Sequence, residues 1–455
     1  MEKIQFNFRI DKKNNITLTN QLIENIKNAI LKGGFKSHDK LPSIRVASNT
    51  LDVSKSVIIN AYLQLVTEGF IENIEKKGFY ISHIKKEVVS NLDYDLEYNE
   101  DNIQFINDGI DENCFDNSLW KKYYNNVLFD ENIDLLNAGD EQGEFELRHA
   151  ISNFIKANRG LKCTPQQIII GSGIQTLLEM IIRVVGKEYN KVALESPGYK
   201  KAKFIFEDYN FNITNLPVLD DGVDLNALEG IEKALIYTSP AYQYPMGKVM
   251  SIDKRLELIH HANEKDCLII EDDYASTIRY EVKPVPSLQG LDFYDNTMYI
   301  GSFSKTLLPS LRISFMVMPK KYLKRYYNIK SKYTNTCSKI AQIALANFIK
   351  EGQFEKHLKR INKIYKQKNI IISNYIKNNY GNKLIIKNNE SGFHMILECK
   401  ASVKIDIIKQ FHDEFLNIEI INTQNNEFTF LFNYTGIKNE EIPIIIEKMA
   451  KILHI

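Results

Sequence analysis

The first eighty residues carry a pattern of apolar and polar positions that predicts three helices and a hairpin. Over 16–31, apolar residues recur every four positions and a Gly-Gly pair follows, as expected for one face of a helix and its end. A serine precedes each of two further helical segments, 44–50 and 55–68, as a helix cap. Residues 70–81 predict two short strands. This order is typical of a winged helix-turn-helix.

From about residue 166, short apolar runs alternate with helical stretches such as 175–185 and 253–264. The runs are Ile168–Ile170, Val192–Leu194, Ala234–Tyr237, Leu268–Ile270, Met298–Ile300 and Ile313–Met318. Buried runs interleaved with helices predict an α/β fold with a mainly parallel sheet covered on both faces. Ligands of such sheets bind beyond the carboxyl ends of the strands. After Lys320, long helices followed by mixed strands predict a smaller C-terminal α+β subdomain.

The length of 455 residues predicts more than one domain. Residues 87–116 hold ten acidic residues and no Lys or Arg, which is typical of a linker, with an acidic regulatory segment as the alternative. We expect a helix-turn-helix domain over 1–84, a linker over 85–116 and the α/β domain over 117–455. Within the last, the C-terminal subdomain is expected over 321–455.

Charge and composition narrow the classes of partner. Residues 1–84 contain 12 Lys and Arg against 8 Asp and Glu, a net of +4, so the remainder of a chain with net charge +1 must sum to −3. A basic small unit favours an anionic partner, although chance surface charge explains the asymmetry equally well. No apolar run reaches membrane-spanning length, no signal peptide is present, and five single cysteines lack metal-ligand spacing. We therefore expect a cytoplasmic protein without a metal or membrane partner.

The segment 301–312 carries the strongest candidate chemistry. Lys305 follows a predicted strand end, and a deprotonated lysine amine can form a Schiff base with an aldehyde cofactor. Ser302, Ser304 and Arg312 suit a phosphate dianion. Taken alone, however, a Ser-x-Ser-Lys segment is more typical of an ordinary surface.

Three acids and Tyr274 end the predicted strand at 268–270. Pyridoxal chemistry needs a carboxylate against the pyridinium nitrogen, while the alternative is a solvated strand end. Residues 170–175 form a glycine-rich strand-to-helix turn whose amides could bind phosphate. Two further turns, 195–199 and 238–247, could present aromatic or polar side chains to a ring, although each alone is an ordinary turn.

Together these five segments resemble the fold-type I aminotransferases. Their spacing is similar to that of the MocR/GabR-type transcriptional regulators, which join such a domain to a GntR-type winged helix. Residues 41–45 and 53–62 match the GntR pattern, and 138–148 with 159–160 match the segment ahead of the sheet. The resemblance extends from about residue 16 to about residue 450.

The resemblance implies pyridoxal 5′-phosphate (PLP) as cofactor. Lys305 would form the Schiff base, Asp272 would pair with the pyridinium nitrogen, and Tyr274 and Tyr199 would lie beside the ring. The residues implied to hold the phosphate are Arg312, Ser302, Ser304, Gly173, Ile174 and Gln175. Those implied to contact a DNA operator are Ser43, Arg45, Ser54, Lys55, Ser56 and, in the wing, Lys76 and Lys77; the two serines that precede helices would also cap them. A head-to-tail homodimer would present two recognition helices to two half-sites.

The sequence departs from the family at the positions where an arginine usually binds the carboxylate of an amino acid. No arginine occurs in Phe428–Tyr434, and Lys200 or Lys201 replaces a second arginine; Ala275, Thr277 and Ile278 also depart from the usual pattern. Because the arginine clamp is missing, we expect a regulator whose operator binding responds to PLP or a PLP-amine adduct and controls vitamin B6 supply, with at most weak transamination. The alternatives are a working aminotransferase with an appended DNA-binding domain, and a DNA-binding protein whose large domain is only a dimerisation scaffold.

Overall fold

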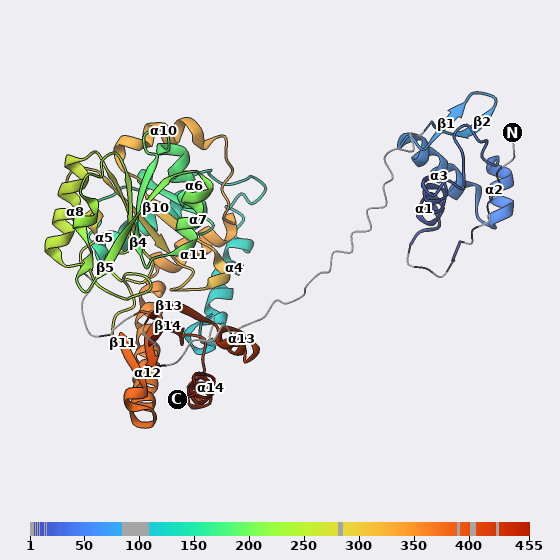
Figure 1. The fold of residues 1–455 in the computed structure, drawn as a ribbon. Helices are drawn as coiled ribbons and strands as arrows, with labels where there is room; N and C mark the ends of the chain where they lie inside the picture. The colour runs from blue at the N-terminus through green and yellow to red at the C-terminus, as the bar shows by residue number, and fades with distance from the viewer. Residues whose placement is uncertain are drawn as a thin grey trace. The chain divides into compact units, whose positions relative to one another are not determined.

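The computed structural model describes residues 4–455 apart from 5, 7, 9, 13, 15, 84–108, 281–284, 389–391, 401–405 and 425–426. The chain divides into two compact units, Met1–Asp101 and Asn102–Ile455. Figure 1 traces the fold of each unit. The predicted linker over 85–116 lies outside the described residues up to residue 108.

The first unit contains three helices and a two-stranded antiparallel hairpin, in the predicted order. They are α1 (Leu18–Leu31), α2 (Ile44–Leu51), α3 (Lys55–Thr67), β1 (Ile71–Ile74) and β2 (Gly78–Ile81). Ser43 Oγ accepts the amide of Val46 and Ser54 Oγ accepts that of Val57, which confirms both as helix caps. The apolar faces of the helices form one core.

Residues ahead of α1 also belong to this core. Phe6 is 5% exposed, and Ile4, Phe8 and Ile10 pack against the same cluster. The ring of Phe6 lies 5.0 Å from that of Phe8. The sequence pattern placed the first element of this domain at residue 16, so the contribution of the N-terminus to the core was not predicted. The alternating apolar residues before residue 11 could have indicated it.

The second unit is built on an eight-stranded sheet in the order β3-β10-β9-β8-β7-β4-β5-β6. The strands are β3 (Ile168–Gly171), β4 (Lys191–Ser196), β5 (Asn212–Leu219), β6 (Gly222–Val223), β7 (Leu235–Thr238), β8 (Leu268–Asp273), β9 (Thr297–Ser302) and β10 (Ser314–Val317). The strands β5, β4, β7, β8 and β9 are parallel, and β10 is antiparallel to both neighbours. All six predicted apolar runs form strands of this sheet, as the α/β prediction requires. The segments that follow β4, β7, β8 and β9 therefore meet at one edge.

Helices cover both faces of the large sheet (Figure 1). One face packs against α6 (Ile174–Val185), α7 (Lys200–Asp208) and α10 (Lys320–Lys330). The other packs against α5 (Phe145–Arg159), α8 (Ile252–Glu264) and α11 (Lys339–Lys350). The remaining helices of this part are α4 (Asn117–Phe129), which packs on α11, and the short α9 (Leu288–Leu291). Short 3-10 turns occupy Glu112–Cys114, Pro165–Gln167, Leu225–Leu228, Pro309–Leu311, Gly381–Lys383 and Asn439–Glu441.

A smaller antiparallel sheet with the order β11-β12-β14-β13 follows the long helix α12 (Gln353–Asn379). Its elements are β11 (Leu384–Asn388), β12 (His394–Lys400), α13 (Asp406–Asp413), β13 (Ile418–Gln424), β14 (Glu427–Asn433) and α14 (Ile442–Leu453). The helices α10 and α11 pack with the large sheet. The small subdomain therefore begins further along the chain than residue 321, where the sequence pattern placed it. Among the described residues, no helix has the length and apolarity needed to cross a membrane.

The first described residues of the second unit are fastened to the small subdomain. Asp111 and Lys368 of α12 form an ion pair of 2.6 Å in which the side chains are 5% and 0% exposed. Lys368 also donates to the backbone oxygens of Thr435 and Ile437, just beyond β14. The Thr435 hydroxyl donates to the carbonyl of Gly109. The chain therefore enters this unit through a buried polar anchor on the small subdomain.

Candidate functional site

Three consecutive carboxylates end β8 at the carboxyl edge of the large sheet, and all three are buried. Successive residues of a strand point to opposite faces. Glu271 accepts the amides of Leu288 and Gln289. Asp273 pairs with Arg159 at 2.7 Å, and although burial opposes ionisation, this ion pair holds the pKa of Asp273 below its usual value.

Asp272 points to the other face and is the carboxylate with an unused oxygen. Its Oδ2 accepts the hydroxyl of Tyr237, from the end of β7. Its Oδ1 is buried and has no hydrogen-bond partner among the described residues. Burial raises the pKa of Asp272 to about 7. A buried acceptor without a donor is costly, so this oxygen is suited to a donor supplied by a ligand.

The predicted phosphate residues converge at the start of α6. Gly173 precedes the helix with φ 118°, and a Cβ there would meet Nη2 of Arg312 at 2.6 Å. Ser314 pairs with Gly171 on one side and with Ser302 on the other. The Ser302 hydroxyl accepts from Ser314 and from the Ser304 amide.

Helix amides and a guanidinium placed together form an anion site. Ile174 and Gln175 supply the first turn of α6. Ser304 Oγ is buried without a partner among the described residues. The glycine at residue 173 keeps the approach to these groups free of a side chain, as a phosphate would require.

Lys305 follows β9 and is exposed, and it contributes to lowering the pKa of the buried His394, at the start of β12. Burial is the larger cause and brings the pKa of His394 to about 4, so the imidazole is neutral near pH 7. The Tyr274 hydroxyl is buried and lacks a partner among the described residues. Burial and the charge of Asp272 raise the pKa of Tyr199 to about 12.

These side chains fit PLP. Asp272 Oδ1, Tyr274 Oη and Ser304 Oγ are buried polar atoms without a partner in the described part of the chain, and the family resemblance assigns their residues to the ring nitrogen, the ring oxygen and the phosphate. Lys305 lies on the adjoining strand end. One arrangement thus offers an amine, a ring carboxylate and an anion cradle, which are the groups that hold this cofactor.

Three residues around this site were not predicted from the sequence, and a fourth, Glu195, was expected only as part of the 195–199 turn. Tyr237 ends a predicted strand run, and its position at a carboxyl end was a signal that could have identified it. Glu195 ends β4, accepts the hydroxyl of Thr238 at 2.5 Å, and has a pKa raised by burial to about 7. His394 and Glu419 come from the small sheet, far away in sequence, and no local pattern marks them.

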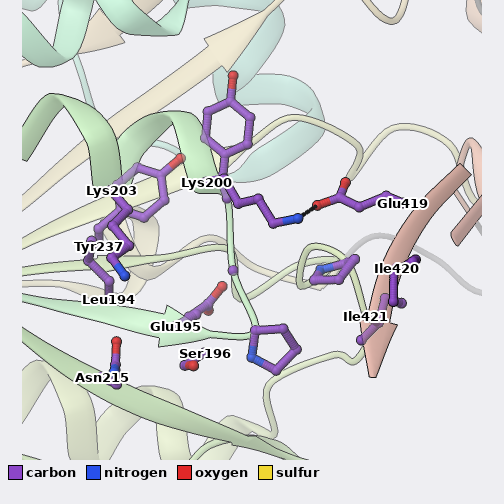
Figure 2. A pocket seen from close by; sticks show the side chains of 14 residues that line it. Leu194, Glu195, Ser196, Lys200, Lys203, Asn215, Tyr237, Glu419, Ile420 and Ile421 are labelled. Carbon is purple, nitrogen blue, oxygen red and sulfur yellow. Dashed lines mark ion pairs between the residues drawn. The ribbon is translucent and has the colours of Figure 1, made fainter. Parts of the chain in front are cut away.

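A pocket of about 220 Å³ adjoins the cofactor residues. Figure 2 shows Glu195 and Ser196 at the end of β4, Lys200 reaching across the opening, and Glu419 on the small sheet opposite. Lys200 Nζ lies 2.9 Å from Glu419 Oε1. Tyr199 and Tyr237 line both this pocket and the surroundings of Asp272.

The residues predicted to contact DNA are all exposed in the first unit. Ser43 and Arg45 lie at the start of α2, and Ser54, Lys55 and Ser56 at the start of α3. Lys76 and Lys77 form the hairpin turn. The starts of two helices and a basic hairpin tip are the parts with which a winged helix-turn-helix meets a phosphate backbone and a groove.

Comparison with known proteins agrees with this division. Residues 18–81 match the family model of the bacterial regulatory proteins of the gntR family, and residues 109–444 match that of aminotransferase class I and II. The HTH-type transcriptional regulator YdeL of Bacillus subtilis (strain 168) is 35% identical over 390 residues, which cover 84% of each chain.

Two more relatives carry names that describe a role. The probable rhizopine catabolism regulatory protein MocR of Rhizobium meliloti is 27% identical and covers 88% of this chain and 85% of its own. The pyridoxine biosynthesis regulator PdxR of Corynebacterium glutamicum is 26% identical, covering 84% and 83%. The chain belongs to the MocR-type transcriptional regulators.

Solved structures agree with the fold of the second unit of this MocR-type regulator. An archaeal alanine:glyoxylate aminotransferase has a TM-score of 0.68 and is 26% identical, covering 76% of this chain and 89% of that one. The kynurenine aminotransferase of Pyrococcus horikoshii, 22% identical with a TM-score of 0.66, shares the fold with similar coverage. Aminotransferases of class I and II are PLP-dependent enzymes.

The small sheet of this MocR-type regulator and the helix that follows it contain no arginine. The last arginine of the sequence is Arg360, and 361–455 contain none. The side chains of β14 from Phe428 to Phe432 are apolar or threonine and are buried. No guanidinium from this part of the chain can form a bidentate pair with a substrate carboxylate.

Proposed function

We propose that this MocR-type regulator binds PLP at Lys305 and that PLP, or a PLP-amine adduct, changes its affinity for a DNA operator. The observation that carries the proposal is Asp272 Oδ1, a buried carboxylate oxygen with no partner among the described residues. An unfilled acceptor of this kind has a physical reason when a pyridinium N–H occupies it. When bound, PLP would supply an electrophilic ring system that reacts with amines.

The chain's own residues would orient and neutralise the cofactor. Tyr237 donates to Asp272 Oδ2 and so fixes the direction in which Oδ1 points. Arg312, beside Gly173, would neutralise the phosphate together with the first amides of α6. Tyr274, whose buried hydroxyl has no partner among the described residues, would donate to the ring oxygen.

The first unit would bring this chemistry to DNA. Arg45, Lys55, Lys76 and Lys77 are exposed and would neutralise phosphates, while the start of α3 would reach base edges in the major groove. Operator binding would respond to PLP if the cofactor favours one arrangement of the regulator over another.

A homodimer is the assembly we propose. Leu136, 98% exposed, and Phe129, 81% exposed, lie between the end of α4 and the start of α5, where Phe145 is 49% exposed. Large apolar side chains left in water at this density are typical of a surface that another chain covers. Two copies would also supply two recognition helices for two half-sites.

A second candidate is that the cofactor alone is the signal and that the target genes control vitamin B6 supply. The missing arginine of 361–455 favours it, because the chain keeps its PLP-binding residues without an amino-acid clamp. The similarity to PdxR supports the same interpretation. The absence of arginine from residues 361–455 also argues against efficient turnover as an aminotransferase.

The test is a visible-spectrum titration of the full chain with PLP, in the wild type, Lys305→Ala and Lys305→Arg. We expect an absorption band of a protein-bound Schiff base in the wild type and no such band in either variant, because neither replacement offers the required amine. Lys321→Ala, on α10, is the matched control and should keep the band. A wild type without a band contradicts PLP binding.

Operator affinity, measured with and without PLP at fixed salt, tests the regulatory half. We expect the wild-type dissociation constant to change at least fivefold and that of Lys305→Ala to stay the same, since a coupling of 1–3 kcal/mol corresponds to about 5- to 150-fold. An unchanged wild-type affinity and operator bend would contradict the regulatory role while leaving PLP binding intact.

A further inference from the structure

The small sheet offers a carboxylate, rather than an arginine, to the pocket beside the cofactor residues. Glu419 lies in β13 directly opposite Leu431 of β14, within the stretch where an amino-acid-binding arginine was expected. Residues directly opposite in an antiparallel pair share a face. A ligand carboxylate at this face would therefore meet a negative charge, and no guanidinium from residues 361–455.

Glu419 contacts a cluster of aromatic rings centred on Tyr244. The Tyr244 hydroxyl donates to Glu419. The Tyr244 ring centroid lies 6.1 Å from that of Tyr199, 5.9 Å from that of Tyr274 and 5.8 Å from that of His394. Aromatic faces attract cations, most strongly when water is excluded. The neutral His394 ring adds no opposing charge, so the wall is suited to an ammonium group.

The chain already places an ammonium beside this carboxylate. Lys200 Nζ lies 2.9 Å from Glu419 Oε1, and the lysine side chain is 61% exposed (Figure 2). Ion pairs with such an exposed partner contribute little to stability and exchange readily. The Lys200 ammonium therefore marks a position that a ligand ammonium could take over at small cost.

Glu419 lies close to residues that contact the proposed cofactor site. The Tyr244 ring lies beside that of His394. The charge of Lys305 lowers the pKa of His394, and the charge of Glu419 raises it. The pocket of about 220 Å³ is lined by Tyr199 and Tyr237, which lie near Asp272, and also by Glu419. A flexible aliphatic chain of a few carbons fits this volume.

We propose that Glu419, with the rings of Tyr199 and Tyr244, forms a subsite for the ammonium group of an aliphatic diamine. The inference rests on the proposed PLP site, because the other amine of the ligand would lie toward Lys305. The effector class is thus a dication without a carboxylate. Glu419 supplies a charge-assisted hydrogen bond, and the tyrosines replace part of the water around the ammonium.

The experiment compares three probes that share one primary amine and a similar chain. They are 1,4-diaminobutane, butylamine and 4-aminobutanoate, which end in an ammonium, a methyl and a carboxylate. Each is titrated into the PLP-loaded full chain, with binding followed by calorimetry and by the visible spectrum. Because all three probes share the reactive amine, differences between their dissociation constants measure how the protein binds the group at the other end.

We expect 1,4-diaminobutane to bind about tenfold or more tightly than butylamine, and 4-aminobutanoate to bind more weakly than both. Glu419→Gln keeps the shape and removes the charge, so it should abolish the advantage of the diamine. Lys200→Met removes the competing ammonium and should strengthen diamine binding. Glu398→Gln, which removes the carboxylate of a Lys387 pair elsewhere in the same sheet, is the matched control and should change nothing.

The outcomes separate this inference from the proposed function. A chain that takes up no PLP contradicts the proposed function itself. A PLP-loaded chain that binds the three probes equally, or prefers 4-aminobutanoate, contradicts the diamine subsite and leaves the cofactor alone as the signal. An advantage that survives in Glu419→Gln also overturns the inference, because the selectivity would then come from another group.

Discussion

At the scale of single residues, identical side chains acquire different chemistry from their neighbours. Asp272 and Asp273 are adjacent and buried, yet burial raises the pKa of the first to about 7 while Arg159 holds that of the second below its usual value. The local sequence predicted three acids at the end of a strand, and the family resemblance implied that Asp272 is the one that pairs with the ring nitrogen. The position of Tyr237 at the end of a predicted strand was the one local signal for it, since the hydrogen bond to Asp272 depends on the pairing of β7 with β8.

The raised pKa of Asp272 makes cofactor-free stability depend on pH. In the folded chain Asp272 holds its proton up to about pH 7, while in the unfolded chain it loses it near pH 4. Its contribution is therefore fully present below about pH 4 and is lost as the pH rises through 7. We expect the wild type to lose on the order of 1–3 kcal/mol relative to Asp272→Asn between pH 5 and pH 8.

The measurement is urea unfolding of both proteins, without PLP, at several pH values. Glu271, whose pKa burial also raises to about 7, titrates in both proteins and cancels in the difference, whereas Glu195→Gln is introduced into both because the charge of Glu195 raises the pKa of Asp272. A difference that does not change with pH would mean that Asp272 is ionised throughout this range in the folded chain.

The crowding at Gly173 predicts a selective loss of cofactor binding. In Gly173→Ala the new Cβ would meet Arg312 Nη2 at 2.6 Å and displace the guanidinium from the phosphate cradle. We expect PLP affinity to fall at least tenfold, since a charged hydrogen bond contributes about 1.5–3 kcal/mol. Gly230→Ala is the control, because Gly230 also has a positive φ but its Cβ would meet nothing within 4 Å. Equal PLP affinities in the two variants would contradict the cradle.

At the scale of elements, the pattern of apolar residues predicted the strands that are buried on both faces of the sheet. It missed a strand whose side chains are largely exposed. The six fully apolar runs became strands of the sheet because burial on both faces leaves an unbroken signal. The strand β5 (Asn212–Leu219) was missed, since most of its side chains are exposed or half-buried. The placement of α10 and α11 with the large sheet was also missed, because the helical period does not identify the partner of a helix.

The anchor between Asp111 and α12 predicts a large stability effect at one buried lysine. Lys368→Met leaves the Asp111 carboxylate buried without its partner and frees two carbonyl oxygens. We expect a loss of about 3–5 kcal/mol in the free energy of unfolding. Urea unfolding followed by fluorescence of Trp120, the one tryptophan of the chain, reports on this unit.

The matched control for this anchor is Lys438→Met. Lys438 pairs with Glu112 nearby, but the two side chains are 46% and 68% exposed, so we expect a far smaller loss of stability than in Lys368→Met. Similar losses in the two variants would show that burial does not distinguish these ion pairs.

At the scale of the whole molecule, the chain carries separate cores in its two units. Ile26 is fully buried in the core of the first unit, and Ile181 in a core of the second. The length of the chain predicted more than one domain, and the acidic segment from residue 87 was interpreted as a linker between two of them. His394 and Glu419 were beyond prediction, because only the folded small sheet brings them to the edge of the large one.

Separate cores predict separable unfolding. Ile26→Ala should destabilise the first unit by about 2–5 kcal/mol through the cavity it leaves. We expect calorimetry to show one transition moving to lower temperature while the Trp120 fluorescence transition stays in place. Ile181→Ala should do the reverse. If both transitions move together in either variant, the two units unfold as one cooperative structure.

The division of labour between the two sheets has an evolutionary consequence. Every residue assigned to the cofactor lies at the end of a strand of the large sheet, in a loop beside one, or at the start of one of its helices, whereas Glu419 and Leu431 belong to the small sheet. Mutations in β13 and β14 can therefore alter ligand preference without disturbing the groups that would retain PLP. If the small sheet sets the ligand as proposed, a lineage of such regulators could change what it senses through a few substitutions in one sheet while its cofactor residues stay the same.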